Sequence, residues 1–183
     1  MDKLTGPAIG RPKTGTFRLG DLVGHDTAAK VIQGIKENCP NDEQAGAFEV
    51  PEYLQFLLDN KFLGDKSGKG FYQKTKEKDK NGRKIILALN LETLEYAPST
   101  RPSLKSLDTA KQIENLPKRI RAVFKAEDKG GELVRKSLAG LFAYVSNRIP
   151  EISDNLYSID DALRAGFGWE MGPFEYWDTI GLE

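Results

Sequence analysis

The sequence predicts a mainly helical fold that carries one small β-hairpin. Three observations lead to this fold class. Apolar residues recur at helical spacing over long stretches, most clearly after residue 131. The run Lys80-Asn81-Gly82 is a strong hairpin signal between two extended segments. A twelve-residue segment near the start, Gly15 to Asp26, is repeated at the end as Gly172 to Glu183.

The repeated segment has the same local design in both copies. Gly, Phe, Asp and Gly recur in the same four columns, and Val23 is answered by Ile180. Each copy predicts a turn, a short helix, a left-handed C-cap glycine and an N-cap carboxylate for the next helix. Because the chain opens just before one copy and stops as the second ends, we expect it to be a piece of a longer protein.

The first half of the chain predicts two helices followed by the hairpin. After an irregular loop over residues 6–15, a helix is expected from the capping pair Asp26-Thr27 to about Asn38. A second helix is expected to begin at Pro51. The two hairpin strands are expected over residues 71–76 and 84–90, with a third short strand over 94–97.

The second half predicts only helices. They are expected over residues 104–115, 118–126, 132–149 and from Ser158 through Arg164, and Pro150 should end the long one. The proline-rich run over residues 98–102 is the expected boundary. A first helical unit over 1–98, including the hairpin at about 71–97, would precede a second, truncated unit over 103–183.

Composition excludes several classes of protein. The 27 basic residues balance 27 acidic ones, so no net charge attracts nucleic acid or an anionic membrane. No apolar run approaches the roughly 18 residues of a membrane span. Cys39 is the only cysteine, which excludes an intramolecular disulfide and a zinc cluster. A cytoplasmic location is the resulting expectation.

No stretch of the sequence predicts catalytic machinery. The run Gly64 to Phe71 is a glycine turn that feeds a strand, because its spacing and order differ from a phosphate loop. The only histidine, His25, lies in a loop without a partner, and Cys39 lies at a helix end that disfavours a thiolate. Asp160 and Asp161 are charges at a helix N-terminus. We therefore expect no catalytic residue, no cofactor site and no metal site in this chain.

Three motifs in the right order resemble the C-terminal helical domain of L-3-hydroxyacyl-CoA dehydrogenases. The family pattern is roughly Gly-x-Pro-Met-Gly-Pro-Phe-Glu-Leu-x-Asp-x-x-Gly-Leu-Asp. The run from Gly10 to Asp26 is similar to this pattern, and the run from Met171 to Glu183 is more similar still. Between them, the run from Lys66 to Tyr72 is similar to the family's Lys-x-Gly-x-Gly-Phe-Tyr. Two copies are typical of the multidomain β-oxidation enzymes.

The resemblance implies a fold and a division of labour. The fold would be a helical bundle like the C-terminal domain of 6-phosphogluconate dehydrogenase, with a small β-hairpin insertion. NAD and the catalytic His–Glu pair would belong to a Rossmann domain before Met1. The helical domain would close over the acyl-CoA and supply an association surface, so a homo-oligomer is also expected. By resemblance, the substrate-binding residues would be Gly15, Phe17, Gly172, Pro173 and Phe174.

The resemblance gives His25 no catalytic role, because His25 stands where the family has Leu. The complete enzyme would oxidise an (S)-3-hydroxyacyl-CoA to the 3-oxoacyl-CoA. One alternative is a non-catalytic helical module that binds a protein partner. Another is a helical domain from a different dehydrogenase of similar architecture. A Rossmann glycine fingerprint upstream of Met1 would distinguish the first interpretation from the interaction module.

Overall fold

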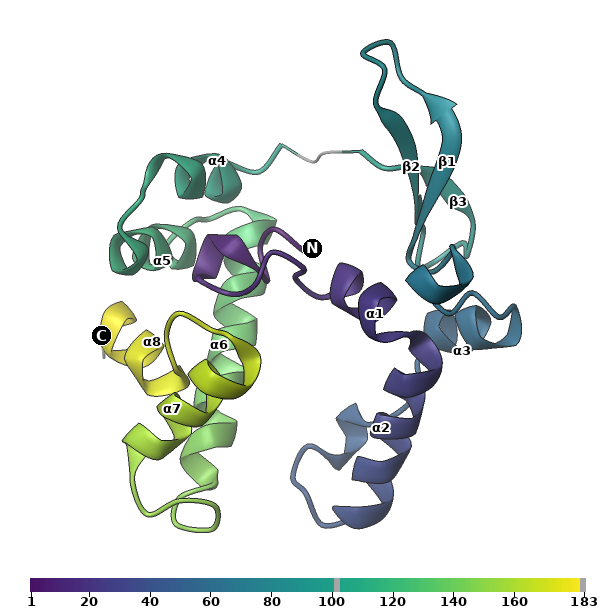
Figure 1. Cartoon of the computed structure of the whole chain (residues 1–183). Coiled ribbons are helices and arrows are strands. Elements are labelled where there is room, and N and C mark those ends of the chain that lie inside the picture. Colours follow the sequence, from purple (N-terminus) through teal and green to yellow (C-terminus); the bar gives the residue numbers. More distant parts are fainter. Residues whose placement is uncertain (101–102, 182–183) are drawn as a thin grey trace. The chain divides into compact units, whose positions relative to one another are not determined.

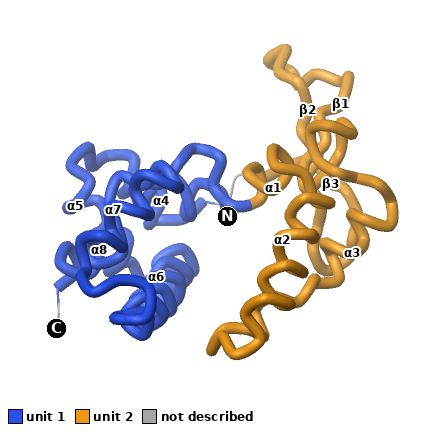
Figure 2. Tube along the Cα trace, turned by 60° about the horizontal axis from the view of Figure 1, so that its bottom comes forward, with its two compact units in different colours: residues 1–16, 102–183 blue, residues 17–101 orange. Residues whose placement is uncertain are grey.

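The computed structural model describes residues 1–100 and 103–181 (Figure 1). The chain forms two compact units (Figure 2). Unit 1 joins residues 1–16 to residues 102–183, and unit 2 holds residues 17–101. Unit 1 therefore contains both ends of the chain, and unit 2 lies between them in sequence.

Unit 2 begins with helices and ends with a sheet. Its helices are α1 (Phe17–Val23), α2 (His25–Asn38) and α3 (Glu52–Asp59). Strands β1 (Tyr72–Lys78), β2 (Lys84–Leu89) and β3 (Tyr96–Pro98) form an antiparallel sheet in the order β1-β2-β3. The hairpin turn is closed by Asp79, whose carboxylate accepts hydrogen bonds from the backbone of Asn81 and Arg83. The expected hairpin and third strand are therefore present.

The core of unit 2 is small and aromatic. Leu57 of α3, Phe71 and Leu89 of β2 are buried at its centre. Phe71 makes ring contacts with Phe17, at 4.7 Å between centroids, and with Tyr53, at 5.9 Å. The residue that follows the glycine-rich run thus contacts aromatic side chains of both α1 and α3.

Unit 1 is helical throughout the described residues. It opens with the short 3₁₀ helix η1 (Pro7–Ile9) and continues with a set of helices after residue 103. These helices are α4 (Lys105–Gln112), α5 (Leu116–Phe124), α6 (Lys129–Asn147), α7 (Leu156–Phe167) and α8 (Pro173–Ile180). The expected long helix is α6, and it ends three residues before Pro150.

Residues 1–16 belong to unit 1 because their apolar side chains fill its core. Leu4, Ala8 and Ile9 are buried against the apolar stripe of α6 and against Tyr176 of α8. The hydroxyl of Tyr176 is fully buried and donates to the carbonyl of Ile9 at 2.5 Å. Burial raises the pKa of this phenol, so it stays a donor. The N-terminal segment is an integral part of this unit.

The compact units divide the chain differently from the expected units 1–98 and 103–183. Residues 1–16 pack with the second half because an apolar 3₁₀ turn completes the core there. The expected boundary over residues 98–102 includes Arg101 and Pro102, which lie outside the described residues. The last two residues of the second repeat, Leu182 and Glu183, also lie outside them.

Several local expectations need correction. Asp26 does not cap α2, because Gly24 is the N-cap and the Asp26 carboxylate pairs with Lys66 instead. Gly24 has a positive φ of 97°, but its ψ of 133° takes it outside the left-handed helical region. The expected irregular loop over residues 6–15 contains η1. Helix α7 begins at Leu156 with Asn155 as its N-cap, rather than at Ser158.

The N-cap of α6 predicts how the stability of unit 1 depends on pH. Asp128 accepts hydrogen bonds from the backbone of Ser106 at 2.8 Å and of Gly131 at 2.9 Å. The hydrogen bond from Ser106 contributes most to holding the pKa of Asp128 below its ordinary value of 3.8, and the bond from Gly131 adds to it. A lowered carboxyl pKa adds stability above the ordinary pKa, and that stability is lost as pH falls through the folded-state pKa.

We therefore expect the urea midpoint of unit 1 to fall more steeply below pH 4 in the parent chain than in Asp128→Asn. Asparagine keeps a cap acceptor without the charge. Both tryptophans lie in unit 1, so tryptophan fluorescence follows its unfolding. Parallel pH profiles in the two proteins would contradict the assignment.

Candidate functional site

The first copy of the repeat is organised around one buried carboxylate. Asp21 of α1 is 2% exposed. Its Oδ1 accepts a hydrogen bond from the backbone N–H of Phe71 at 2.7 Å, and its Oδ2 accepts one from Tyr72 at 2.9 Å. Hydrogen bonds from backbone N–H groups to an ionised carboxylate are among the stronger ones in proteins. They tie the glycine-rich run to α1 across 50 residues of sequence.

The glycines of this run are required by the approach to Asp21. A Cβ atom at Gly70 would lie 2.1 Å from Asp21 Oδ1, and one at Gly64 would lie 2.2 Å from the Asp21 carbonyl oxygen. No side chain fits at such distances. The similarity of this run to Lys-x-Gly-x-Gly-Phe-Tyr therefore has a physical basis. The glycines let the backbone of the run pack directly against the Asp21 carboxylate.

His25 completes the cluster around Asp21. It lies in the first turn of α2, not in a loop, and it is 1% exposed. Its Nε2 lies 3.0 Å from Asp21 Oδ1, and its ring meets Phe71 edge-on at 4.8 Å between centroids. An ionised carboxylate only accepts, so Nε2 carries the proton in this contact. The histidine is a buried structural partner of Asp21, a role that the sequence expectation missed.

The second copy is also built on a buried carboxylate, but one from a different helix. Asp160 of α7 accepts a hydrogen bond from the backbone N–H of Phe174 at 2.8 Å. A Cβ atom at Gly172 would lie 2.3 Å from Asp160 Oδ1, so this position also requires glycine. Burial raises the pKa of Asp160. The expectation that Asp160 is simply a charge at a helix N-terminus misses this contact, because Asp160 is 6% exposed and accepts from the next helix.

Side chains beside Asp160 fix the start of α8. Glu175 accepts a hydrogen bond from the backbone N–H of Gly172 at 2.7 Å, three residues earlier. Arg164 of α7 donates to Glu175 at 2.7 Å and to Asp161 at 2.5 Å. The beginning of the second signature is thus held by three carboxylates and one guanidinium.

Some glycines before and within the two copies share unusual backbone conformations. Gly10 has φ 73° and ψ 32°, and Gly168 has φ 63° and ψ 32°, each as a left-handed C-cap just before its signature. Gly24 and Gly181, which end the two short signature helices, have φ 97° and 93°. Within the copies, Gly24 and Gly181 thus share a backbone conformation, whereas Gly15 with φ 62° and Gly172 with φ −80° differ.

Within unit 1, the loops that precede the two signatures contact each other. The backbone N–H of Glu170, two residues after Gly168, donates to the carbonyl of Gly10 at 2.8 Å. Pro12 stands two residues after Gly10 and packs on Gly168, where a Cβ atom would lie 3.7 Å from the proline ring. Proline has no N–H, so the reciprocal hydrogen bond cannot form. The two loops are therefore joined by one backbone hydrogen bond and one apolar contact.

A guanidinium–indole stack reinforces this loop contact. The guanidinium carbon of Arg11 lies 3.7 Å from the ring centroid of Trp169, and these residues follow Gly10 and Gly168 directly. Burial lowers the pKa of Arg11. A cation over an indole ring is stabilising by about 0.5–2 kcal/mol, depending on desolvation. The other aromatic side chains at this end, including Trp177 stacked on Phe142 at 5.1 Å, also pack within unit 1.

The structure separates the residues expected to bind substrate. Phe174 lines a pocket of about 490 Å³ together with Leu156, Tyr157, Trp177 and others of α7 and α8. Gly172 and Pro173 are buried beneath it. Phe17 packs in the aromatic core of unit 2. Gly15 packs against Asp2, since a Cβ atom there would lie 2.4 Å from that residue's backbone. Among the five, Phe174 alone is a pocket-lining residue in the pockets described.

Other kinds of site are not evident in the described part of the chain. Residues 1–100 and 103–181 contain no group of three or more His, Cys, Asp or Glu side chains that could hold a metal ion. None of the helices described is both long enough and apolar enough to cross a membrane. Cys39 is exposed and follows α2 as its C-cap.

The mainly helical fold, with a glycine-rich run that closes on Asp21, is the architecture that the resemblance to dehydrogenase C-terminal domains implied. Residues 1–74 match the family described as "3-hydroxyacyl-CoA dehydrogenase, C-terminal domain". This part of the chain is a C-terminal domain of the 3-hydroxyacyl-CoA dehydrogenase family, as the motifs indicated.

Curated relatives agree with this assignment. The chain is 37% identical over 183 residues to a protein of Bacillus subtilis (strain 168) named "Probable 3-hydroxyacyl-CoA dehydrogenase", which covers 100% of this chain. It is 28% identical over 176 residues, 96% of the chain, to a Rickettsia felis protein provisionally named fatty acid oxidation complex trifunctional enzyme. It spans only 22% of the length of each.

A third relative matches a shorter part of the chain. A Deinococcus radiodurans protein, also named "Probable 3-hydroxyacyl-CoA dehydrogenase", is 44% identical over 77 residues, which are 42% of this chain and 21% of that protein. No solved structure is significantly similar to the chain.

The two aspartates at the same column of the repeat provide a matched test of the Asp21 cluster. Asp21→Ala leaves two backbone N–H groups and His25 without their acceptor, and buried groups that lose a partner cost about 1–3 kcal/mol each. We expect unit 2 to lose about 3 kcal/mol or more of its unfolding free energy on this basis. The control is Asp178→Ala, because Asp178 is exposed and such changes cost less than about 0.5 kcal/mol.

Hydrogen exchange measured by NMR reports directly on this cluster. The amides of Phe71 and Tyr72 should lose protection in Asp21→Ala and keep it in Asp178→Ala. Retained protection in the first variant would contradict the role given to the carboxylate.

Proposed function

We propose that this chain is the substrate and association domain of an NAD-dependent (S)-3-hydroxyacyl-CoA dehydrogenase of fatty-acid β-oxidation. The complete enzyme would oxidise the 3-hydroxyacyl-CoA to the 3-oxoacyl-CoA. The observation that carries the proposal is the closure of the glycine-rich run on Asp21, within the residues that match the family. The names of the relatives favour it over the alternative of a protein-binding module.

The hydride chemistry would belong to a Rossmann domain that is not in this chain. NAD would bind there, and the catalytic His–Glu pair would lie there. His25 is unsuited to replace that histidine, because it is 1% exposed and its Nε2 is committed to Asp21. The helical domain would cover the acyl-CoA and exclude water from the transfer. Self-association and a cytoplasmic location are parts of the same proposal.

The five residues expected to bind substrate would act in two ways. Phe174 is a candidate for direct contact with an acyl chain, because it is half-buried at a pocket that it lines together with Leu156 and Trp177, beside charged residues of α7 and α8. Gly172 and Pro173 would act indirectly, since they bring the start of α8 against Asp160. Gly15 and Phe17 would shape the start of the first signature and the core beneath it.

The proposal is tested by joining the chain to its upstream sequence. The protein translated from the complete reading frame should oxidise NADH in the presence of acetoacetyl-CoA, which is the reverse reaction. The 183-residue chain alone should not, because its sequence has no Gly-x-Gly-x-x-Gly fingerprint after a buried strand. Turnover by the isolated chain, or an upstream sequence without such a fingerprint, would overturn the proposal.

The same full-length protein tests Phe174. Replacing Phe174 by Ala should raise KM for a medium-chain 3-oxoacyl-CoA by about tenfold with a smaller change in kcat, because lost apolar contact weakens binding by about 1–3 kcal/mol. The matched control is Phe167→Ala, because Phe167 is 64% exposed and does not line the pocket. Equal effects of the two changes would remove Phe174 from the site.

A further inference from the structure

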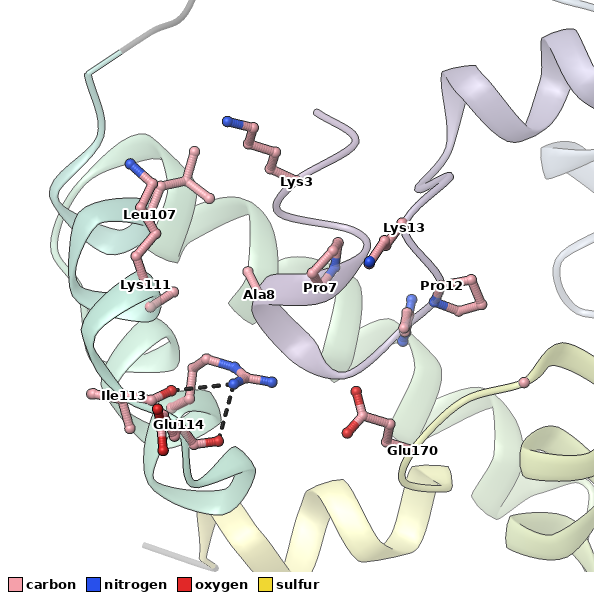
Figure 3. Close-up of a pocket in the computed structure, with 14 residues that line it drawn as sticks. Lys3, Pro7, Ala8, Pro12, Lys13, Leu107, Lys111, Ile113, Glu114 and Glu170 are labelled. Carbon is pink, nitrogen blue, oxygen red and sulfur yellow. Dashed lines mark hydrogen bonds between the residues drawn. The ribbon is translucent and has the colours of Figure 1, made fainter.

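Unit 1 contains a second and larger pocket, of about 630 Å³, outside the signature segments (Figure 3). Its walls come from the N-terminal segment, from α4, from the turn between α4 and α5, and from the loop after α7. Small-molecule sites in proteins have volumes of roughly 300–1,000 Å³. The pocket is therefore large enough for a ligand of moderate size.

The floor of this pocket is apolar. It is made by the side chains Pro7, Ala8, Leu107, Ala110 and Ile113. Figure 3 shows Ala8 and Pro7 of η1 facing Leu107 of α4 across the pocket. Apolar lining of this kind binds hydrocarbon, because transfer out of water is favourable in proportion to the area covered.

Cations outnumber carboxylates among the residues that line the pocket, which include Lys3, Arg11, Lys13, Lys111 and Arg119 against Glu114 and Glu170. Lys3 and Lys13 belong to the N-terminal segment, whereas Glu114 follows α4 and Glu170 follows α7 (Figure 3). Lys3 and Lys13 form no salt bridge within the described residues, whereas the lining residue Lys111 is paired with Asp108 at 2.7 Å. The two free ammonium groups can therefore take an anion without first breaking an ion pair.

Arg11 adds a further cation, which forms no salt bridge within residues 1–100 and 103–181. It lines the pocket, it stacks on Trp169, and its Nε has no hydrogen-bond partner within the described part of the chain. A cation in a partly enclosed site of low dielectric produces a stronger field than one on an open surface. The positive charge of the pocket lining is therefore only partly balanced by the protein.

We propose that this pocket binds a small amphipathic anion, an alkyl chain of medium length that carries a carboxylate or phosphate head. The chain would lie on the floor formed by Pro7, Ala8 and Leu107. The head would lie between Lys3 and Lys13. This site does not depend on the function proposed for the complete enzyme, because every residue in the argument lies in unit 1 of this chain.

Calorimetric titration of the 183-residue chain tests the site with hexanoate, octanoate, decanoate and decyl phosphate, all below the concentrations at which they form micelles. We expect saturable binding of one ligand per chain. Affinity should rise by up to about fourfold for each added CH₂, because burial of one such group is worth about 0.8 kcal/mol. A preference for decanoate would indicate a fatty acid, and a preference for decyl phosphate a phosphorylated lipid.

Charge is tested with a cationic probe and matched variants. Decyltrimethylammonium should bind at least tenfold more weakly than decanoate. Lys3→Ala combined with Lys13→Ala should weaken decanoate binding by about tenfold, which corresponds to the loss of two close charge contacts of modest strength. The control is Lys30→Ala combined with Lys80→Ala, because both lysines are exposed in unit 2. It should leave the affinity unchanged.

Three results would overturn the proposal. They are the absence of saturable binding for every probe, equal binding of the cationic probe, and equal effects of the two double variants. Thermal unfolding followed by tryptophan fluorescence checks that each variant is folded. Leu107→Ala tests the apolar floor of the pocket independently. It should reduce the gain in affinity for each CH₂ added to the ligand.

Discussion

The carboxylate of Asp21 is the point on which unit 2 depends. It receives two backbone N–H groups from the start of the sheet and the ring of His25 from the next helix. A buried carboxylate is costly unless such donors surround it. These contacts connect α1 to α2 and to the glycine-rich run. The glycines of that run are a consequence, because any Cβ at Gly70 would collide with the carboxylate.

The second copy also packs against a buried carboxylate, but this carboxylate does not come from the repeat itself. Its signature aspartate, Asp178, is exposed, and the buried carboxylate comes from Asp160 on the preceding helix. Where the first copy has Gly20, against which Phe71 packs, the second has Trp177, which stacks on Phe142. Two segments of similar sequence are thus stabilised by different partners.

Much of the fold could be predicted from the sequence because local signals agree with the tertiary structure. The hairpin at Asn81-Gly82 and the apolar spacing of α6 are strong signals that act over a few residues. The roles of His25 and Asp160 could not be predicted, because they depend on groups 4–50 residues away that only the fold brings together. The pocket beside Lys3 was missed for the same reason, since its walls come from distant parts of the chain.

Unit 1 combines the earliest and latest parts of the chain, and this has a consequence for folding during synthesis. Tyr176 donates to the carbonyl of Ile9 across 167 residues. Leu4, Ala8 and Ile9 therefore have no complete core to join until α8 has left the ribosome, whereas every residue of unit 2 has been made by then. Domains are released and fold in the order in which their residues become available. Unit 2 can therefore fold first, and residues 1–16 complete their packing only once α8 has been made.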